Sequence, residues 1–300
     1  MKIWTDGARH WAGQVSRIDG GFLKLGHELT HHIEEADLIY SNNPWWDEII
    51  QLKIDSKIGG KIIFNVLDIP LHILKEFNLQ KLRTQLGYAD AVTSISSWTK
   101  KQLMNHCGVD SSVIYNPIKN VCRDPRIQVT PFFPFCHVGR RFDANKRASI
   151  GLNAVSILGY EQKDVCLVGN EGGWGTMMGV LSDEKLNVVY NSCSFVLATG
   201  KIEGIGLPAI EAIACGAIPV ICNDLTTREE FFPSSIFPEY DFVSPNAASI
   251  ASFLGYLINN KDIAGDFQNR LHDHYLKNWR HKMSGLGVAE SILNVYKNIK

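Results

Sequence analysis

The sequence lacks the features of several large classes of protein. Its seven cysteines are odd in number and never spaced as C-x-x-C, which argues against a disulfide framework or a zinc site. No apolar run approaches the length of a membrane span, and the first ten residues, MKIWTDGARH, lack the apolar stretch of a signal peptide. We therefore expect a cytoplasmic protein with reduced cysteines and no membrane span.

The sequence also lacks an excess of charge of either sign. Its formal net charge is −1, and neither half of the chain is strongly basic. No global field would therefore gather it onto nucleic acid or anionic lipid. The chain contains no D-x-D triplet of the kind that often holds a catalytic metal, so we expect no metal in the site.

What the sequence does contain is a regular alternation of short apolar runs with longer segments of helical period. This pattern is typical of βαβ units and parallel sheets, and it predicts an α/β fold. In the first half we expect strands at 2–4, 36–40, 61–66, 89–95 and 112–116. In the second half we expect strands at 134–138, 166–169, 195–199 and 218–222.

The two sets of strands predict two domains joined by a linker. Residues 117–131 combine prolines and charges without clear periodicity, so we expect one domain over 1–130 and another over 131–275. The final stretch, 276–300, contains the amphipathic run VAESILNVYKNI and predicts a last helix. Ligands of open parallel sheets bind at the carboxyl ends of the strands, here in a crevice between the domains.

The most informative segment is KIEGIGLPAIEAIACGAIPV, residues 201–220. It predicts a strand end, a glycine turn, a helix starting near Pro208 and ending before Gly216, and a buried strand. The start of such a helix offers backbone amides and the positive end of a dipole to a phosphate. Glu203 precedes the turn and Glu211 lies one helical turn inside. The hydroxyl groups of a nucleotide sugar would suit both carboxylates.

This segment resembles the E-G-x-G-L-P-x-x-E-A signature of the retaining, family-4-type glycosyltransferases. The resemblance implies a GT-B fold, with two Rossmann-like parallel-sheet domains facing a central cleft and the last helix crossing back to the first domain. It also implies that Glu203 contacts the transferred sugar and Glu211 holds the ribose of the donor. The donor would further contact the backbone of Gly204, Ile205, Gly206 and Leu207.

A second element, VGRRFDANKR at 138–147, resembles the family's V-G-R-x-x-x-x-K motif, whose Arg and Lys neutralise the donor diphosphate. Lys146 supplies the lysine, and its charge suits that task. Either of two arginines fits the pattern. Arg140 keeps the V-G-R adjacency, while Arg141 keeps the usual spacing to the lysine.

Three further residues are candidates by the same resemblance. Gly169 opens a glycine-rich loop, LVGNEGGWG, that corresponds to one near the nucleotide. Gly13 lies in a segment similar to the family's N-terminal glycine loop, which faces the donor phosphates or the acceptor. Asp68 stands near the position where the family commonly has a histidine beside the reacting sugar, and we include it as a candidate catalytic residue.

These matches predict a glycosyltransferase that moves a sugar from a nucleotide diphosphate sugar to a hydroxyl group, with retention and without a cofactor. The expected acceptor is a glycan or lipid-linked glycan; a hydroxylated DNA base is an alternative weakened by the balanced charge. Another alternative is a non-catalytic protein that binds nucleotide sugars. A third is a nicotinamide-dependent oxidoreductase, because GIGLPA at 204–209 has the form G-x-G-x-x-A and Asp224 follows at a suitable distance.

Overall fold

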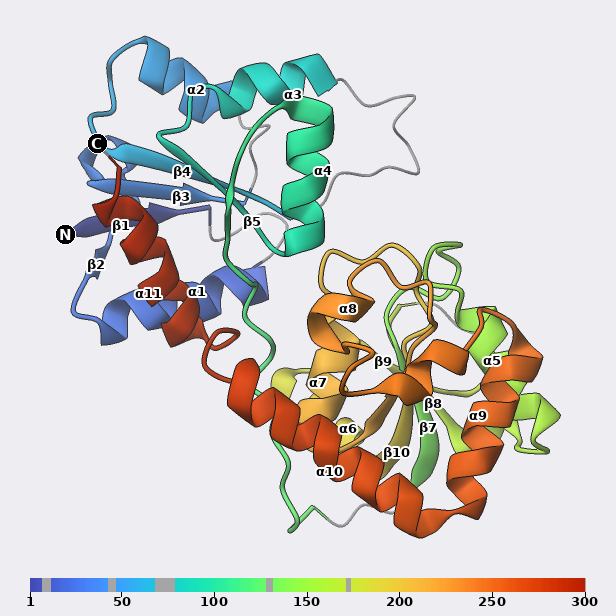
Figure 1. The fold of residues 1–300 in the computed structure, drawn as a ribbon. Helices are drawn as coiled ribbons and strands as arrows, with labels where there is room; N and C mark the ends of the chain where they lie inside the picture. The colour runs from blue at the N-terminus through green and yellow to red at the C-terminus, as the bar shows by residue number, and fades with distance from the viewer. Residues whose placement is uncertain (7–11, 43–46, 68–78, 128–131, 171–173, 300) are drawn as a thin grey trace. The chain divides into compact units, whose positions relative to one another are not determined.

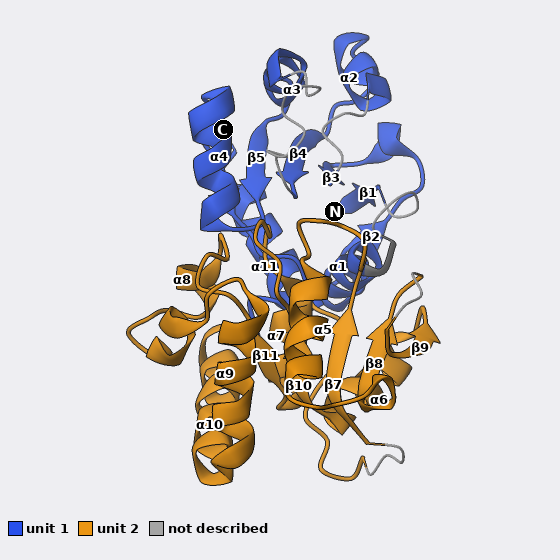
Figure 2. Ribbon diagram, turned by 90° about the vertical axis from the view of Figure 1, so that its right-hand side faces the viewer, with its two compact units in different colours: residues 1–117, 281–300 blue, residues 118–280 orange. Residues whose placement is uncertain are grey.

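The computed structural model describes residues 1–6, 12–42, 47–67, 79–127, 132–170 and 174–299. The chain forms two compact units, shown in different colours in Figure 2: unit 1 comprises residues 1–117 and 281–300, and unit 2 comprises residues 118–280. Residues 118–127, where the sequence predicts a linker, are included in unit 2. None of the helices among the described residues has the length and apolar character that a membrane span needs.

Unit 1 is a six-stranded parallel sheet with the order β2-β1-β3-β4-β5-β6. Its strands are β1 Lys2–Thr5, β2 Glu28–Leu29, β3 Leu38–Ser41, β4 Lys61–Val66, β5 Ala91–Ser94 and β6 Ser112–Val113. Its helices are α1 Ala12–Lys24, η1 Ile33–Glu35, α2 Asp47–Ile54, α3 Leu79–Leu86, α4 Ser97–Cys107 and α11 Gly285–Lys297.

The central strands of unit 1 are buried on both faces, as their continuous apolar sequences require. On β3, Leu38 and Tyr40 pack with residues of α1 and α11, whereas Ile39 packs with residues of α2, α3 and α4. These two groups of helices cover opposite faces of the sheet (Figure 1). Helix α4 is capped by Ser96, whose side chain accepts a hydrogen bond from the backbone amide of Thr99 at 3.1 Å.

Unit 2 is a five-stranded parallel sheet with the order β11-β10-β7-β8-β9. Its strands are β7 Phe133–Val138, β8 Val165–Val168, β9 Thr176–Gly179, β10 Cys193–Leu197 and β11 Ile218–Val220. Its helices are α5 Ala148–Ile157, η3 Gln162–Asp164, α6 Asp183–Ser192, α7 Leu207–Cys215, α8 Arg228–Phe231, η4 Pro238–Phe242, α9 Ala247–Asn259 and α10 Lys261–Asn278. This order places β7 and β10 side by side, so the loops that follow these two strands meet at one edge of the sheet.

Glycine determines how closely the last helix packs in unit 1. Gly21 of α1 faces Gly285 at the start of α11, and a Cβ atom at either position would clash with a backbone carbonyl oxygen of the other helix. Gly20, the preceding residue of α1, has nothing within 4 Å of its own Cβ position. The close approach of the two helices therefore depends on Gly21.

This contrast predicts opposite effects of the same substitution at neighbouring positions. Gly21→Ala should lower the free energy of unfolding by about 1–3 kcal/mol, because the added methyl group forces α1 and α11 apart. Gly20→Ala should leave it unchanged or raise it by up to about 1 kcal/mol, because alanine favours a helix. Urea unfolding of both variants measures the difference, and equal effects would contradict the close packing described.

Candidate functional site

The loop after β7 carries the predicted basic residues and is shaped by Asp143. The carboxylate of Asp143 accepts a hydrogen bond from the backbone amide of Asn145 at 3.0 Å, and its carbonyl oxygen accepts one from Lys146 at 2.9 Å. Arg140 pairs with the same carboxylate at 2.9 Å, and its side chain is 75% exposed. Arg141 lies over the ring of Phe142 at 4.4 Å. Neither arginine contacts Glu203 in any described interaction. These contacts therefore do not decide which of the two arginines meets the donor diphosphate.

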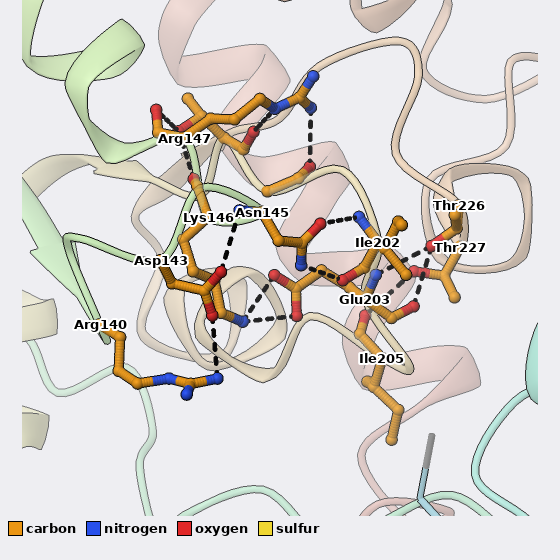
Figure 3. A network of polar contacts seen from close by, with 12 residues as sticks. Arg140, Asp143, Asn145, Lys146, Arg147, Ile202, Glu203, Ile205, Thr226 and Thr227 are labelled. Atoms are coloured by element: carbon orange, nitrogen blue, oxygen red, sulfur yellow. Dashed lines mark hydrogen bonds and ion pairs between the residues drawn. The ribbon is translucent and has the colours of Figure 1, made fainter. Parts of the chain in front are cut away.

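The loop after β10 carries Glu203 and is joined to the β7 loop by Asn145 (Figure 3). The side chain of Asn145 accepts a hydrogen bond from the amide of Ile202 at 2.8 Å and donates one to its carbonyl oxygen at 2.6 Å. On the other side of the loop, the hydroxyl of Thr226 accepts from the amide of Glu203 and donates to its carbonyl oxygen, both at 3.0 Å. The backbone of Glu203 is therefore fixed from both sides.

The sequence predicts Lys146 and Glu203 as separate contacts to the nucleotide-sugar donor. In the structure their side chains form a bidentate ion pair (Figure 3). The Lys146 ammonium donates to Oε1 of Glu203 at 2.7 Å and to Oε2 at 2.8 Å. The side chains are 27% and 16% exposed, so each charge has lost much of its water. The carboxylate lies against Gly200, where a Cβ atom would overlap Oε1. Both residues line a small pocket together with His137, Gly206 and Pro208.

The helix α7 begins beside this pair. Its N-cap, Gly206, has φ +81°, a left-handed conformation that favours glycine, and Pro208 lies in the first turn. Gly216 caps the other end with φ +82°, where the sequence predicts the helix to stop. In this first turn Pro208 has no amide hydrogen and the amide of Ala209 donates to the carbonyl oxygen of Gly206 at 2.9 Å, so the donors that this end presents next to Lys146 are the amides of Gly206 and Leu207. Gly204 and Leu207 flank the turn, and Ile205 is buried.

Glu211 has very different surroundings from Glu203. It is 3% exposed and lies among the buried residues of α7. Its Oε2 accepts a hydrogen bond from the hydroxyl of Tyr190 at 2.9 Å, and its Oε1 accepts one from the backbone amide of Lys119 at 3.3 Å. The sequence places Glu211 one turn into the helix but gives no sign of this burial.

Gly169 follows β8 and approaches the loop after β7. It has φ +150°, and a Cβ atom there would lie 2.8 Å from the carbonyl oxygen of Gly139. Glycine at this position lets the loops after β7 and β8 come together. Gly13 lies in the first turn of α1 in unit 1. Asp68 lies outside the described residues.

Arg147 is a residue of the site that the sequence reading did not single out. Its guanidinium forms a fork with the carboxylate of Asp224 at 2.9 and 2.8 Å and donates to the carbonyl oxygens of Thr199 and Gly200. Both carboxylate oxygens of Asp224 are thereby engaged, whereas the nicotinamide alternative requires this residue to bind a ribose. The only available signal was its position directly after Lys146, in a segment with four basic residues.

Among the described residues, no group of three or more His, Cys, Asp or Glu side chains is arranged to hold a metal ion. The absence of a metal requirement stays a prediction, since a substrate can complete a metal site.

Comparison with known proteins identifies the fold. No family model matches the chain. A stretch of 62 residues is 36% identical to O-antigen chain mannosyltransferase B of Escherichia coli, covering 21% of this chain and 16% of that protein. A glycosyltransferase from Rickettsia africae superposes with a TM-score of 0.71 at 16% identity, covering 99% of this chain and 98% of its own.

Two further solved structures agree. WaaG, a glycosyltransferase involved in lipopolysaccharide biosynthesis, has a TM-score of 0.65 at 9% identity and covers 99% of this chain and 100% of its own. TarM of S. aureus, in a complex that includes UDP, has a TM-score of 0.61 at 13% identity, covering 87% of this chain and 55% of its own. The chain has a GT-B fold. The predicted fold class, with two Rossmann-like units, is confirmed.

The different partners of the basic residues predict different costs of removing them. Arg147 is 14% exposed and binds a carboxylate and two carbonyl oxygens, so Arg147→Met should lower the free energy of unfolding by about 2–4 kcal/mol. Arg140→Met, at an exposed pair, should change it by less than about 1 kcal/mol. Chemical unfolding of both variants tests this.

The pairing of Arg147 with Asp224 makes the destabilisation expected for Arg147→Met dependent on pH. The hydrogen bonds from Arg147 hold the pKa of Asp224 below its usual value of 3.8. A carboxyl group whose pKa is lowered in the folded state stabilises that state at pH values above its usual pKa. This contribution is lost as the pH falls through the lowered pKa. The difference in free energy of unfolding between the wild type and Arg147→Met should therefore become smaller below about pH 4. A gap that widens in acid would contradict this account of the pair.

Proposed function

We propose that this chain is a glycosyltransferase that uses a nucleoside diphosphate sugar and transfers its sugar to a hydroxyl group. The observation that carries the proposal is the Lys146–Glu203 pair beside the first turn of α7. It brings together a cation, a carboxylate and helix amides, which suit a diphosphate and a sugar. The GT-B fold and the partial similarity to a mannosyltransferase support the same chemistry.

In this proposal Lys146 changes partners when the donor binds. The diphosphate takes the place of the Glu203 carboxylate at the ammonium, and the amides at the start of α7 bind further phosphate oxygens. Glu203 is then released to accept hydrogen bonds from the hydroxyl groups of the sugar. When the glycosidic bond breaks, negative charge grows on the diphosphate, and the positive groups already in place stabilise it.

The remaining details rest on the motif resemblance. It supports membership of the family-4 type, retention of configuration at the sugar, and catalysis without a bound metal. It also supports roles for Gly169 beside the nucleotide, Gly13 in unit 1, and one of Arg140 and Arg141 at the diphosphate. A glycan or lipid-linked glycan is the acceptor that fits best with neighbours such as WaaG, whose role is in lipopolysaccharide biosynthesis.

The first test removes the proposed diphosphate ligand. Lys146→Ala should weaken binding of a nucleoside diphosphate and of its sugar about ten- to hundredfold alike, because a hydrogen bond to a charged group contributes about 1.5–3 kcal/mol. Isothermal titration with UDP, GDP and ADP first identifies which diphosphate the wild type binds. Arg140→Ala and Arg141→Ala, made singly, are the matched comparisons, and we expect only one of them to matter. Unchanged affinity in Lys146→Ala would exclude the assignment.

The second test distinguishes an exchange of partners from two independent contacts. Glu203→Gln removes the charge that competes for Lys146, so the bare diphosphate should bind about three- to tenfold more tightly. Turnover of the sugar donor should nevertheless fall by at least about tenfold, because the carboxylate no longer meets the sugar. Titration and donor hydrolysis measure the two effects separately. Weaker diphosphate binding in a normally folded Glu203→Gln protein would contradict the exchange.

A further inference from the structure

The buried carboxylate of Glu211 is held by a second buried group, the hydroxyl of Tyr190. Tyr190 lies on α6, its side chain is 0% exposed, and its hydroxyl donates to Oε2 of Glu211 at 2.9 Å. Burial, and next the charge of Glu211, raise the pKa of Tyr190 well above its usual value. The hydroxyl therefore keeps its proton and acts as a donor throughout the neutral range.

The other oxygen of Glu211 has a weaker partner. Oε1 accepts from the backbone amide of Lys119 at 3.3 Å, at the start of unit 2. The chain beyond Lys119 is held without Glu211, because the amides of Asn120, Cys122 and Asp124 donate to three side chains of α6. These acceptors are Asp183, Asn187 and Asn191, spaced one helical turn apart. The Lys119 bond can therefore be exchanged while the segment stays in place.

A carboxylate at this position is costly for the fold. A carboxyl group that is almost fully buried loses its hydration, and hydrogen bonds from neutral groups such as the Tyr190 hydroxyl and the Lys119 amide repay only part of that loss. An apolar side chain would fill the space within α7 more cheaply. The cost is explained if the carboxylate receives further hydrogen bonds during function, and the two neighbouring hydroxyl groups of a ribose can supply them where the Lys119 amide supplies one at 3.3 Å.

We infer that Tyr190 is a positioning residue for the donor nucleoside: its hydroxyl fixes Oε2 of Glu211 so that Oε1 can take a ribose hydroxyl in place of the Lys119 amide. This inference rests on the proposed function, because it assumes that a nucleotide binds to unit 2. Tyr190 itself does not touch the ligand. Its effect is confined to the part of the ligand that Glu211 meets.

The test compares ligands with and without ribose hydroxyl groups. Tyr190→Phe removes one oxygen and keeps the buried ring. By isothermal titration, it should weaken binding of the ribonucleoside diphosphate about five- to tenfold, less than the loss of a direct hydrogen bond to a charged group, because Tyr190 acts on the ligand only through Glu211. Affinities for the 2′,3′-dideoxy analogue and for inorganic pyrophosphate should change less than about twofold, because neither offers ribose hydroxyls to Glu211. Equal weakening for all three ligands would show a merely structural role and overturn the inference.

Unit 2 offers a matched control. Tyr240 is also 0% exposed, and its hydroxyl donates to the carbonyl oxygen of Pro219 at 2.7 Å rather than to a carboxylate. Tyr240→Phe should lower the melting temperature to a similar extent as Tyr190→Phe but leave the ratio of ribose to dideoxy affinities unchanged. A changed ratio in Tyr240→Phe would mean that any lost buried hydroxyl has this effect, and would overturn the inference.

A double mutant tests whether Tyr190 acts through Glu211. In a Glu211→Gln background, Tyr190→Phe should change the affinity for the ribonucleoside diphosphate by less than about twofold, because the carboxylate is already gone. A full five- to tenfold loss in that background would overturn the inference. If the wild type binds no nucleoside diphosphate at all, the proposed function falls with it. If the wild type binds and Tyr190→Phe binds equally well, only the inference falls.

Discussion

The ion pair between Lys146 and Glu203 determines how the predicted site is built. Two charges with side chains only 27% and 16% exposed stabilise each other if their backbones are held in the right place. That condition is met because the sheet order makes β7 and β10 neighbours, so their loops leave the same edge. Asn145 then joins the two loops through both backbone groups of Ile202. The strand order, the loop contacts and the pair thus support one another.

A second pair in the same loops has a different character. Arg147 binds the carboxylate of Asp224 and, at the same time, the carbonyl oxygens of Thr199 and Gly200. Its N–H groups therefore hold the backbone of the loop in place. Lys146 has a compact ammonium group that meets the carboxylate of Glu203 at the edge of a small pocket. A guanidinium with several fixed acceptors is suited to structure, whereas an ammonium on a flexible stem can exchange one anion for another.

Patterns local in sequence predicted much of the fold. The buried strands of both sheets follow apolar runs, and α7 begins and ends at residues whose backbone preferences are strong, Gly206, Pro208 and Gly216. The exposed strand β9, with the sequence TMMG, carries no such pattern, and the helices at 247–278 were not anticipated. In the site, Lys146 and Glu203 were recognisable as candidates, but their contact was not, since 57 residues separate them. Arg147 was missed because its partners are backbone atoms and a carboxylate brought together by folding.

The surroundings of the two glutamates of the motif differ in the same way as the roles proposed for them. Glu203 lies before the helix, and its side chain is 16% exposed and pairs with Lys146. The ammonium of Lys146 is carried on a flexible side chain, so this partner can be exchanged during a reaction. Glu211 lies where α7 is buried and accepts from a tyrosine hydroxyl and a backbone amide. A group that must respond to bond breaking needs exchangeable electrostatic partners, whereas a group that fixes an unchanging part of a ligand benefits from rigid support. The turn at Gly206 separates these two environments, because it marks the passage from loop to buried helix.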